Sequence, residues 1–223
     1  MWLSVFLQGQ VEMKFCIIYD LDGTLIDSRG DLTAAINYMR STYGLEPLTV
    51  ETVTSFIGNG ARKLVERAIV GHDIDLDEAL RRKKEFYAVH KTVNTYLYPG
   101  VADGLAQLHA AGIPQAVVTN KHQEAVGEIL QHLGVLQYFE HIIGGGGDFP
   151  LKPEAESLLH IVEQTGSQAA ASWMVGDHYT DLLAGKRAGV KCCHTAYGFG
   201  DIKNEKFDLE VKQFSAFKQF ILT

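Results

Sequence analysis

The sequence predicts an α/β fold, a doubly wound parallel sheet with a small helical cap inserted near its start. Two observations support this prediction. From residue 97 onward, short apolar runs alternate with helical patterns that end near glycines. Between residues 28 and 96, helical periodicity continues without a convincing strand. We therefore expect a core domain of residues 13–27 and 97–223, a helical cap domain of residues 28–96 and an N-terminal extension of residues 1–12.

The composition is typical of a soluble globular protein, with 46% hydrophobic and 21% charged residues in a chain of 223. A net charge of −7 argues against a nucleic-acid partner, because binding to phosphate backbones requires accumulated Lys and Arg. No apolar run is long enough to span a membrane, so we expect no membrane partner. The sequence leaves a monomer and a homodimer both open.

The cysteines indicate the compartment. Cys16 stands alone, and Cys192 is followed directly by Cys193, which fits neither a metal-ligand spacing nor a disulfide framework. A reducing cytoplasm is therefore the expected location. Residues 1–12 lack a basic leader and a small-residue cleavage site, so we interpret them as a dispensable or non-native extension rather than a signal peptide.

The first strand is predicted at residues 15–19, a continuous apolar run that is typical of a buried parallel strand. Asp20 and Asp22 follow directly, and ligands in open α/β sheets bind at this carboxyl edge. Two carboxylates so close together are costly unless a cation or a proton lies between them. The sequence therefore predicts chemistry at this edge.

The insert contains three predicted helices. The first begins after Ser28, a candidate cap, and its apolar positions follow a helical period. The second covers residues 61–69 and is stopped by Gly71. The third, which is strongly charged, covers residues 75–90.

The second half of the chain contains the remaining strands, each separated from the next by a helical pattern. Strands are predicted at residues 113–119, 141–144, 172–176 and 191–195, with a weaker one at 208–211 and a final helix at 214–222. Short strands alternating with helices are the signature of a doubly wound parallel sheet.

Further polar motifs lie at or near the predicted strand ends. They are Thr119-Asn120, Lys152-Pro153 and the run Gly176-Asp177-His178-Tyr179-Thr180-Asp181. In this order, and together with the Asp20 motif, they resemble the four signature motifs of the haloacid dehalogenase-like phosphatase superfamily. The resemblance covers essentially the whole chain from about residue 15.

The residue types suit phosphoryl transfer, which needs an in-line nucleophile, an acid for the leaving oxygen and compensating positive charge. The resemblance implies that Asp20 is the nucleophile, forming a phosphoaspartate, and that Asp22 is the general acid and base. Thr119 is then expected to donate a hydrogen bond to the phosphoryl group, and Lys152 to offset its charge. Asn120 is expected beside them in the substrate site.

The same resemblance implies a Mg²⁺ cofactor, since a hard cation prefers oxygen ligands. Its expected ligands are the carboxylates of Asp20 and Asp177 and the backbone carbonyl of Asp22. Asp181 is expected behind them, orienting Lys152 and metal-bound waters. Thr24 is expected to hold the Asp22 loop.

The predicted cap carries a further resemblance. Residues 56–68 are similar to the specificity loop and helix of phosphoglycolate phosphatases. Gly58 and Gly60 allow close backbone approach, and Asn59 and Arg62 could donate to a substrate carboxylate. The implied reaction is the hydrolysis of a small anionic phosphate ester, 2-phosphoglycolate.

Alternatives remain at this point. The same motifs suit a phosphatase acting on a sugar phosphate or pyrophosphate, and a phosphotransferase of the β-phosphoglucomutase type. A non-catalytic binding protein on the same fold is a third alternative. Among the other polar residues, we expect Lys121 and His122 at the surface, and His178 in a structural hydrogen bond.

Overall fold

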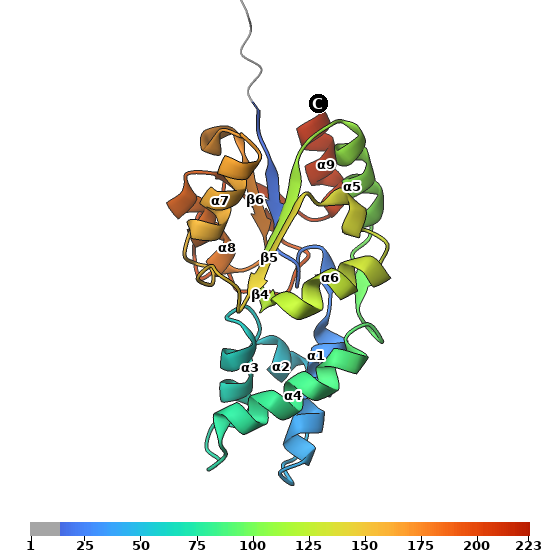
Figure 1. Ribbon diagram of the computed structural model, residues 1–223, viewed down its shortest axis with the longest axis vertical. Helices are drawn as coiled ribbons and strands as arrows, with labels where there is room; N and C mark the ends of the chain where they lie inside the picture. The colour runs from blue at the N-terminus through green and yellow to red at the C-terminus, as the bar shows by residue number, and fades with distance from the viewer. Residues whose placement is uncertain (1–13) are drawn as a thin grey trace, which may run out of the picture.

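The computed structural model describes residues 14–223, so the expected extension at residues 1–12 lies outside the described part of the chain. Its centre is a parallel six-stranded sheet with the order β5-β4-β1-β6-β7-β8 (Figure 1). The strands are β1 (Ile17–Tyr19), β4 (Gln115–His122), β5 (His141–Gly145), β6 (Trp173–Gly176), β7 (Lys191–Thr195) and β8 (Leu209–Val211). The predicted doubly wound sheet is confirmed, and the weak segment near residue 209 forms its edge strand.

The first strand lies in the interior of the sheet, which explains its unbroken apolar run. Ile17 and Tyr19 pack on one face and Cys16 and Ile18 on the other, and all four are fully buried. Both faces are covered by helices, so no position along β1 needs to be polar until the strand ends.

The helices form a layer on each face of the sheet (Figure 1). One layer contains α5 (Val101–Ala110), α6 (Gln123–His132) and α9 (Phe214–Leu222), and the other contains α7 (Glu156–Gln164) and α8 (Tyr179–Ala188). Short 3₁₀ turns, η1 (Leu136–Tyr138) and η2 (Ala169–Ala171), complete the connections. None of the helices described for residues 14–223 has the length and apolar character needed to cross a membrane.

A second group of helices lies at one end of the molecule, beyond the sheet (Figure 1). It contains α1 (Arg29–Ser41), α2 (Val50–Thr54), α3 (Ala61–Ala68) and α4 (Leu76–His90), which share a separate hydrophobic cluster. The chain enters and leaves through an antiparallel pair, β2 (Ile26–Asp27) and β3 (Tyr96–Leu97). We refer to α1–α4 as the helical unit.

The helical unit follows the sequence with two differences. The short helix α2 was not expected, because five residues are too few to show a period. Ser28 precedes α1 but makes no capping hydrogen bond with its side chain. Instead its hydroxyl donates to Asp22 Oδ1 at 2.6 Å, so the expected cap is a site contact.

Asp31 ties the start of α1 to the chain that returns from the helical unit. Its buried carboxylate accepts hydrogen bonds from the backbone N–H of Asn94 at 2.8 Å and from the hydroxyl of Thr95 at 2.8 Å. The side-chain amide of Asn94 donates to it as well, at 3.1 Å. These bonds fix the two segments that connect the helical unit to the sheet.

We expect Asp31→Ala to lower the free energy of unfolding by about 3 kcal/mol, because buried hydrogen-bond donors would lose the charged acceptor to which they are bonded. Urea unfolding followed by circular dichroism measures the change. The control is Asp73→Ala, which alters an exposed carboxylate in the same unit and should change stability by less than about 0.5 kcal/mol. Equal losses of stability in the two variants would contradict the conclusion that Asp31 holds the two connecting segments together.

Candidate active site

The carboxyl edge of the sheet gathers buried acidic side chains around one lysine. Asp20 follows β1, Asp177 follows β6, and Asp181 lies in the first turn of α8. One oxygen of each lies within 4.8 Å of the others, and all three residues are buried. Parallel strands bring their carboxyl ends to one edge, which is why residues so far apart in the sequence meet here.

Lys152 links this acidic cluster. Its Nζ lies 2.9 Å from Asp20 Oδ1 and 2.7 Å from Asp181 Oδ1, and it donates to the carbonyl oxygen of Val118 at 2.6 Å. The residue is 3% exposed. Among the described residues it is the only cation within ion-pair distance of either carboxylate.

The carboxylates outnumber the positive charge that accompanies them. Burial raises the pKa of Asp20 above its usual range, and the charge of Asp181 adds to the rise while Lys152 opposes it. Burial also raises the pKa of Asp177 well above its usual range, with Asp181 and Asp20 adding to the rise. Such a cluster of oxygen donors fits a hard divalent cation, which would compensate the excess negative charge.

Asp177 is held by the loop that follows β7. Its Oδ2 accepts hydrogen bonds from the backbone N–H groups of Phe199 at 3.0 Å and Gly200 at 2.7 Å. Thr24, which belongs to the loop that contains Asp22, donates to the other oxygen of Asp177 at 3.5 Å.

Asp22 lies outside the acidic cluster and has a cation of its own. Lys121 Nζ donates to both oxygens of Asp22, at 2.9 and 3.1 Å. Burial lowers the pKa of Lys121, but the Asp22 carboxylate and the Tyr87 phenol more than offset it, and the pKa lies above its ordinary value. The lysine and the hydroxyl of Ser28 fix the Asp22 carboxyl in one position.

The expectation that Lys121 lies at the surface is wrong, since it is 8% exposed. The strand predicted from the sequence ends at residue 119, whereas β4 continues to His122. Its pairing with β5 is irregular between Val118 and His122, so simple strand alternation does not tell which side chains of this stretch face the cavity.

Thr119 and Asn120 have different surroundings. The Thr119 oxygen accepts the Lys121 backbone N–H at 3.3 Å, which leaves its own hydroxyl proton available. Asn120 bonds the backbone of Lys152 through both its amide nitrogen, at 2.9 Å, and its oxygen, at 2.8 Å. Its amide also donates to Gly58 at 2.9 Å, so it joins the lysine loop to the helical unit.

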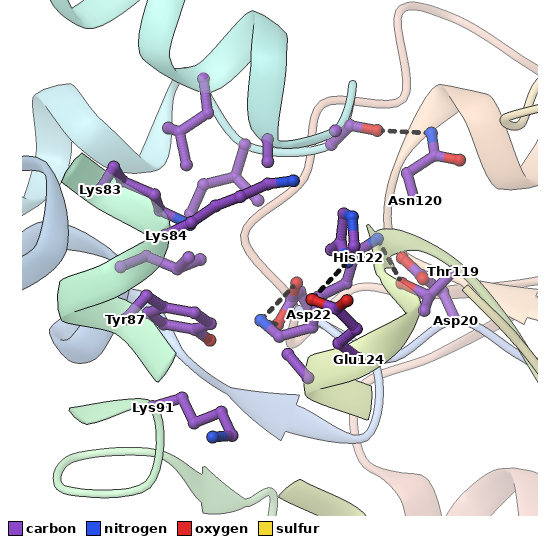
Figure 2. Close-up of a pocket in the computed structure, with 18 of the residues that line it drawn as sticks. Asp20, Asp22, Lys83, Lys84, Tyr87, Lys91, Thr119, Asn120, His122 and Glu124 are labelled. Atoms are coloured by element: carbon purple, nitrogen blue, oxygen red, sulfur yellow. Dashed lines mark hydrogen bonds and ion pairs between the residues drawn. The ribbon is translucent and has the colours of Figure 1, made fainter. Parts of the chain in front are cut away.

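A cavity of about 330 Å³ opens between the sheet edge and the helical unit. Figure 2 shows Asp20, Asp22 and Thr119 on the side of the sheet. Lysines and Tyr87 of α4 face them from the helical unit. Lys152 and Asp181 are not among the residues that line the cavity, and Lys152 contacts both Asp20 and Asp181 behind its wall.

The predicted specificity loop divides into residues that line the cavity and residues that do not. Gly58 and Gly60 line it. Asn59 bonds the Tyr179 hydroxyl at 2.8 Å and the Arg67 guanidinium at 2.8 Å. Arg62 pairs with Asp77 at 2.5 Å on the exposed side of the unit, away from the cavity. In this conformation neither Asn59 nor Arg62 faces the space where a substrate would bind.

His178 has the structural hydrogen bonds that the sequence analysis expected. Its Nδ1 accepts from the Thr180 backbone N–H at the start of α8, while Asp181 accepts from the backbone N–H of His178 at 3.0 Å. Burial lowers the pKa of His178 to about 4, so the ring is neutral near neutral pH. His178 also lines the cavity.

Comparison with known families gives the class of protein. A model of the haloacid dehalogenase-like hydrolases matches residues 17–195, and the chain belongs to this family. Among its relatives, phosphoglycolate phosphatase 1 of Pseudomonas aeruginosa is 40% identical over 190 residues, covering 82% of this chain and 70% of the relative. A phosphoglycolate phosphatase of Psychrobacter arcticus is 37% identical over 226 residues, covering 94% and 96%.

The structural comparison agrees. The crystal structure of a predicted phosphoglycolate phosphatase from Haemophilus somnus superimposes with a TM-score of 0.89 at 28% identity. The match covers 96% of this chain and all of that one. The resemblance inferred from the motifs is thereby confirmed at the level of the family and the fold.

Gly23 provides a test of the packing around Asp177. It has φ of +85°, and a Cβ at this position would lie 1.9 Å from Asp177 Oδ2. We expect Gly23→Ala to lower the free energy of unfolding by at least about 3 kcal/mol, from left-handed strain together with overpacking. Chemical denaturation measures the loss.

The matched control is Gly112→Ala. Gly112 has φ of +73°, but a Cβ added there would have no atom within 4 Å, so this variant reports the strain alone, about 1 kcal/mol. If the two variants lost the same stability, Asp177 would not be packed against Gly23 as described.

Proposed function

We propose that this chain is a Mg²⁺-dependent phosphatase that hydrolyses 2-phosphoglycolate to glycolate and phosphate through a phosphoaspartate on Asp20. The observation that carries the proposal is the pairing of Asp20 with buried Lys152 at the base of a small cavity, beside acidic groups suited to a divalent cation. The relatives named phosphoglycolate phosphatase support the choice of substrate.

In the first step, an Asp20 oxygen attacks the phosphorus in line with the leaving oxygen. A bond forms between Asp20 and phosphorus as the bond from phosphorus to the substrate oxygen breaks. Asp22 enters this step protonated and gives its proton to that oxygen, and glycolate leaves. Asp22 is then the carboxylate whose oxygens accept from Lys121 and Ser28, which fix it beside the cavity.

In the second step, water attacks the phosphorus of the phosphoaspartate. Asp22, now a carboxylate, takes a proton from the water, and the bond between phosphorus and Asp20 breaks. Phosphate leaves, and both aspartates return to their starting states. Thr119 donates its hydroxyl proton to a phosphoryl oxygen in each step, and Lys152 compensates charge on Asp20.

Asp20, Asp177 and the backbone carbonyl of Asp22 would hold the Mg²⁺ ion, with Asp181 positioned by its contact with Lys152. Bound Mg²⁺ would supply electrostatic stabilisation of the charge on the transferring group. We propose that residues 28–96 act as a cap that excludes water while the phosphoaspartate exists. The bond from Asn120 to Gly58 joins that cap to the site.

Turnover across a panel of phosphate esters tests the proposal. We expect wild-type protein with Mg²⁺ to show its highest kcat/KM on 2-phosphoglycolate, ahead of sugar phosphates and pyrophosphate. Asp20→Asn should lower kcat by at least about 1,000-fold, because the nucleophile is lost. Acid-quenched mass spectrometry should detect phosphate on Asp20 in the wild type only.

The control is Asp148→Asn, which changes an exposed carboxylate and should keep wild-type turnover. A preference for a sugar phosphate would replace the proposed substrate, and transfer to a sugar acceptor rather than water would indicate a mutase. Wild-type turnover in Asp20→Asn would exclude Asp20 as the nucleophile.

The metal site has its own test. Mg²⁺ at about 100 times its dissociation constant should stabilise the wild type by about 2.7 kcal/mol, because the ion binds only the folded state. Asp177→Asn should remove most of this gain, whereas Asp148→Asn should keep it. Thermal unfolding with Mg²⁺ and with EDTA measures both. An unchanged Mg²⁺ response in Asp177→Asn would exclude Asp177 as a ligand.

A further inference from the structure

Lys83 is a buried cation that the proposed chemistry does not use. It lies on α4 in a stripe with Ala79 and Tyr87, the buried residues of that helix. Two residues of this stripe, Lys83 and Tyr87, line the cavity (Figure 2). It is 4% exposed, so it is among the most enclosed lysines of the described chain.

Lys83 has no counter-ion among residues 14–223. Its Nζ instead lies over the ring of Tyr87, 4.2 Å from the ring centroid. The nearby carboxylate of Asp22 is already occupied on both oxygens by Lys121. Burial and, to a smaller extent, the charge of Lys121 lower the pKa of Lys83 to about 7, while Asp22 opposes the shift.

An enclosed ammonium without a partner is unfavourable for the folded protein. A different lysine on the same cavity wall shows the ordinary arrangement, since Lys91 pairs with Glu128 at 2.7 Å. Lys83 therefore has the character of a binding group whose partner arrives with the ligand. That partner must be an anion small enough for a cavity of about 330 Å³.

The two ends of the cavity present different side chains to a ligand. The sheet side presents Asp20 and Thr119, which suit a phosphoryl group, and the helical unit presents Lys83 opposite them (Figure 2). A ligand with phosphate at one end and a second anionic group at the other satisfies both. Neutral hydroxyl groups, as in sugar phosphates, would leave the ammonium unpaired.

We propose that Lys83 binds the carboxylate of the substrate and selects phosphate esters of 2-hydroxy carboxylic acids over phosphate esters that carry no second anionic group. The inference rests on the proposed phosphatase function and deepens it. It replaces the expected contacts from Asn59 and Arg62, whose side chains bond Tyr179 and Asp77 instead.

The experiment compares two substrates of nearly the same shape. 2-Phosphoglycolate carries a carboxylate, and 2-hydroxyethyl phosphate carries a hydroxymethyl group at that position. We expect Lys83→Gln to lower kcat/KM for 2-phosphoglycolate about 100-fold, as expected for truncating one partner of an enclosed charge pair. The same variant should change kcat/KM for 2-hydroxyethyl phosphate by less than about 3-fold, and Lys83→Arg should recover part of the loss.

Lys63→Gln controls for general effects, because it removes a lysine that pairs with Glu66 on the exposed surface. It should not change the ratio of the two substrates by more than about 3-fold. Lys83→Met removes the unpaired charge and should melt no lower than the wild type without ligand.

The outcomes separate the two proposals. Equal losses on both substrates, no loss, or a selective loss in Lys63→Gln would each overturn the assignment of Lys83. A lower melting temperature in Lys83→Met would also overturn it, since Lys83 would then stabilise the fold. If the wild type hydrolyses both esters equally, the result contradicts carboxylate recognition but not the proposed phosphatase activity. Absence of turnover on either ester contradicts the proposed function itself.

Discussion

The excess of buried carboxylates at the sheet edge is the constraint on which the site depends. Asp20, Asp177 and Asp181 are brought together by the ends of β1 and β6 and the start of α8, and Lys152 compensates only part of their charge. Low-polarity surroundings make such a cluster costly. The cost explains the dense backbone support, in which the loop after β7 donates to Asp177 and the α8 start donates to Asp181.

The helical unit completes the cavity through a small number of polar contacts. Asn120 donates to Gly58, and the Asn59 amide donates to the Tyr179 hydroxyl. Lys91 pairs with Glu128 across the same boundary. Inside the unit, α1–α4 share a hydrophobic cluster of their own, against which Ala125 of α6 also packs. This arrangement suits a cap that admits a ligand and then encloses it.

The charge of the cavity varies along its length. Asp22 and Lys121 form a matched pair, the acidic cluster lacks positive charge, and Lys83 lacks a negative partner among the described residues. A phosphorylated carboxylic acid together with a divalent cation would supply both missing charges. The same physical requirement therefore links the metal, the proposed substrate and the cationic wall of α4.

The sequence by itself determined the sheet, the position of the helical insert and the order of the motifs, because a buried strand has no polar position until it ends. Asp20 and Asp177 could be placed at one edge for that reason. Only the tertiary structure decided that Lys121 pairs with Asp22, that Ser28 bonds Asp22 rather than its helix, and that Lys83 faces the cavity while Arg62 does not. The positions of Lys121 and Lys83 depend on how α4 and the end of β4 meet across the chain, and local periodicity carries no information about contacts between elements that are distant in sequence. The partners of Ser28 and Arg62 lie closer in sequence, but periodicity does not say which polar group a side chain will bond.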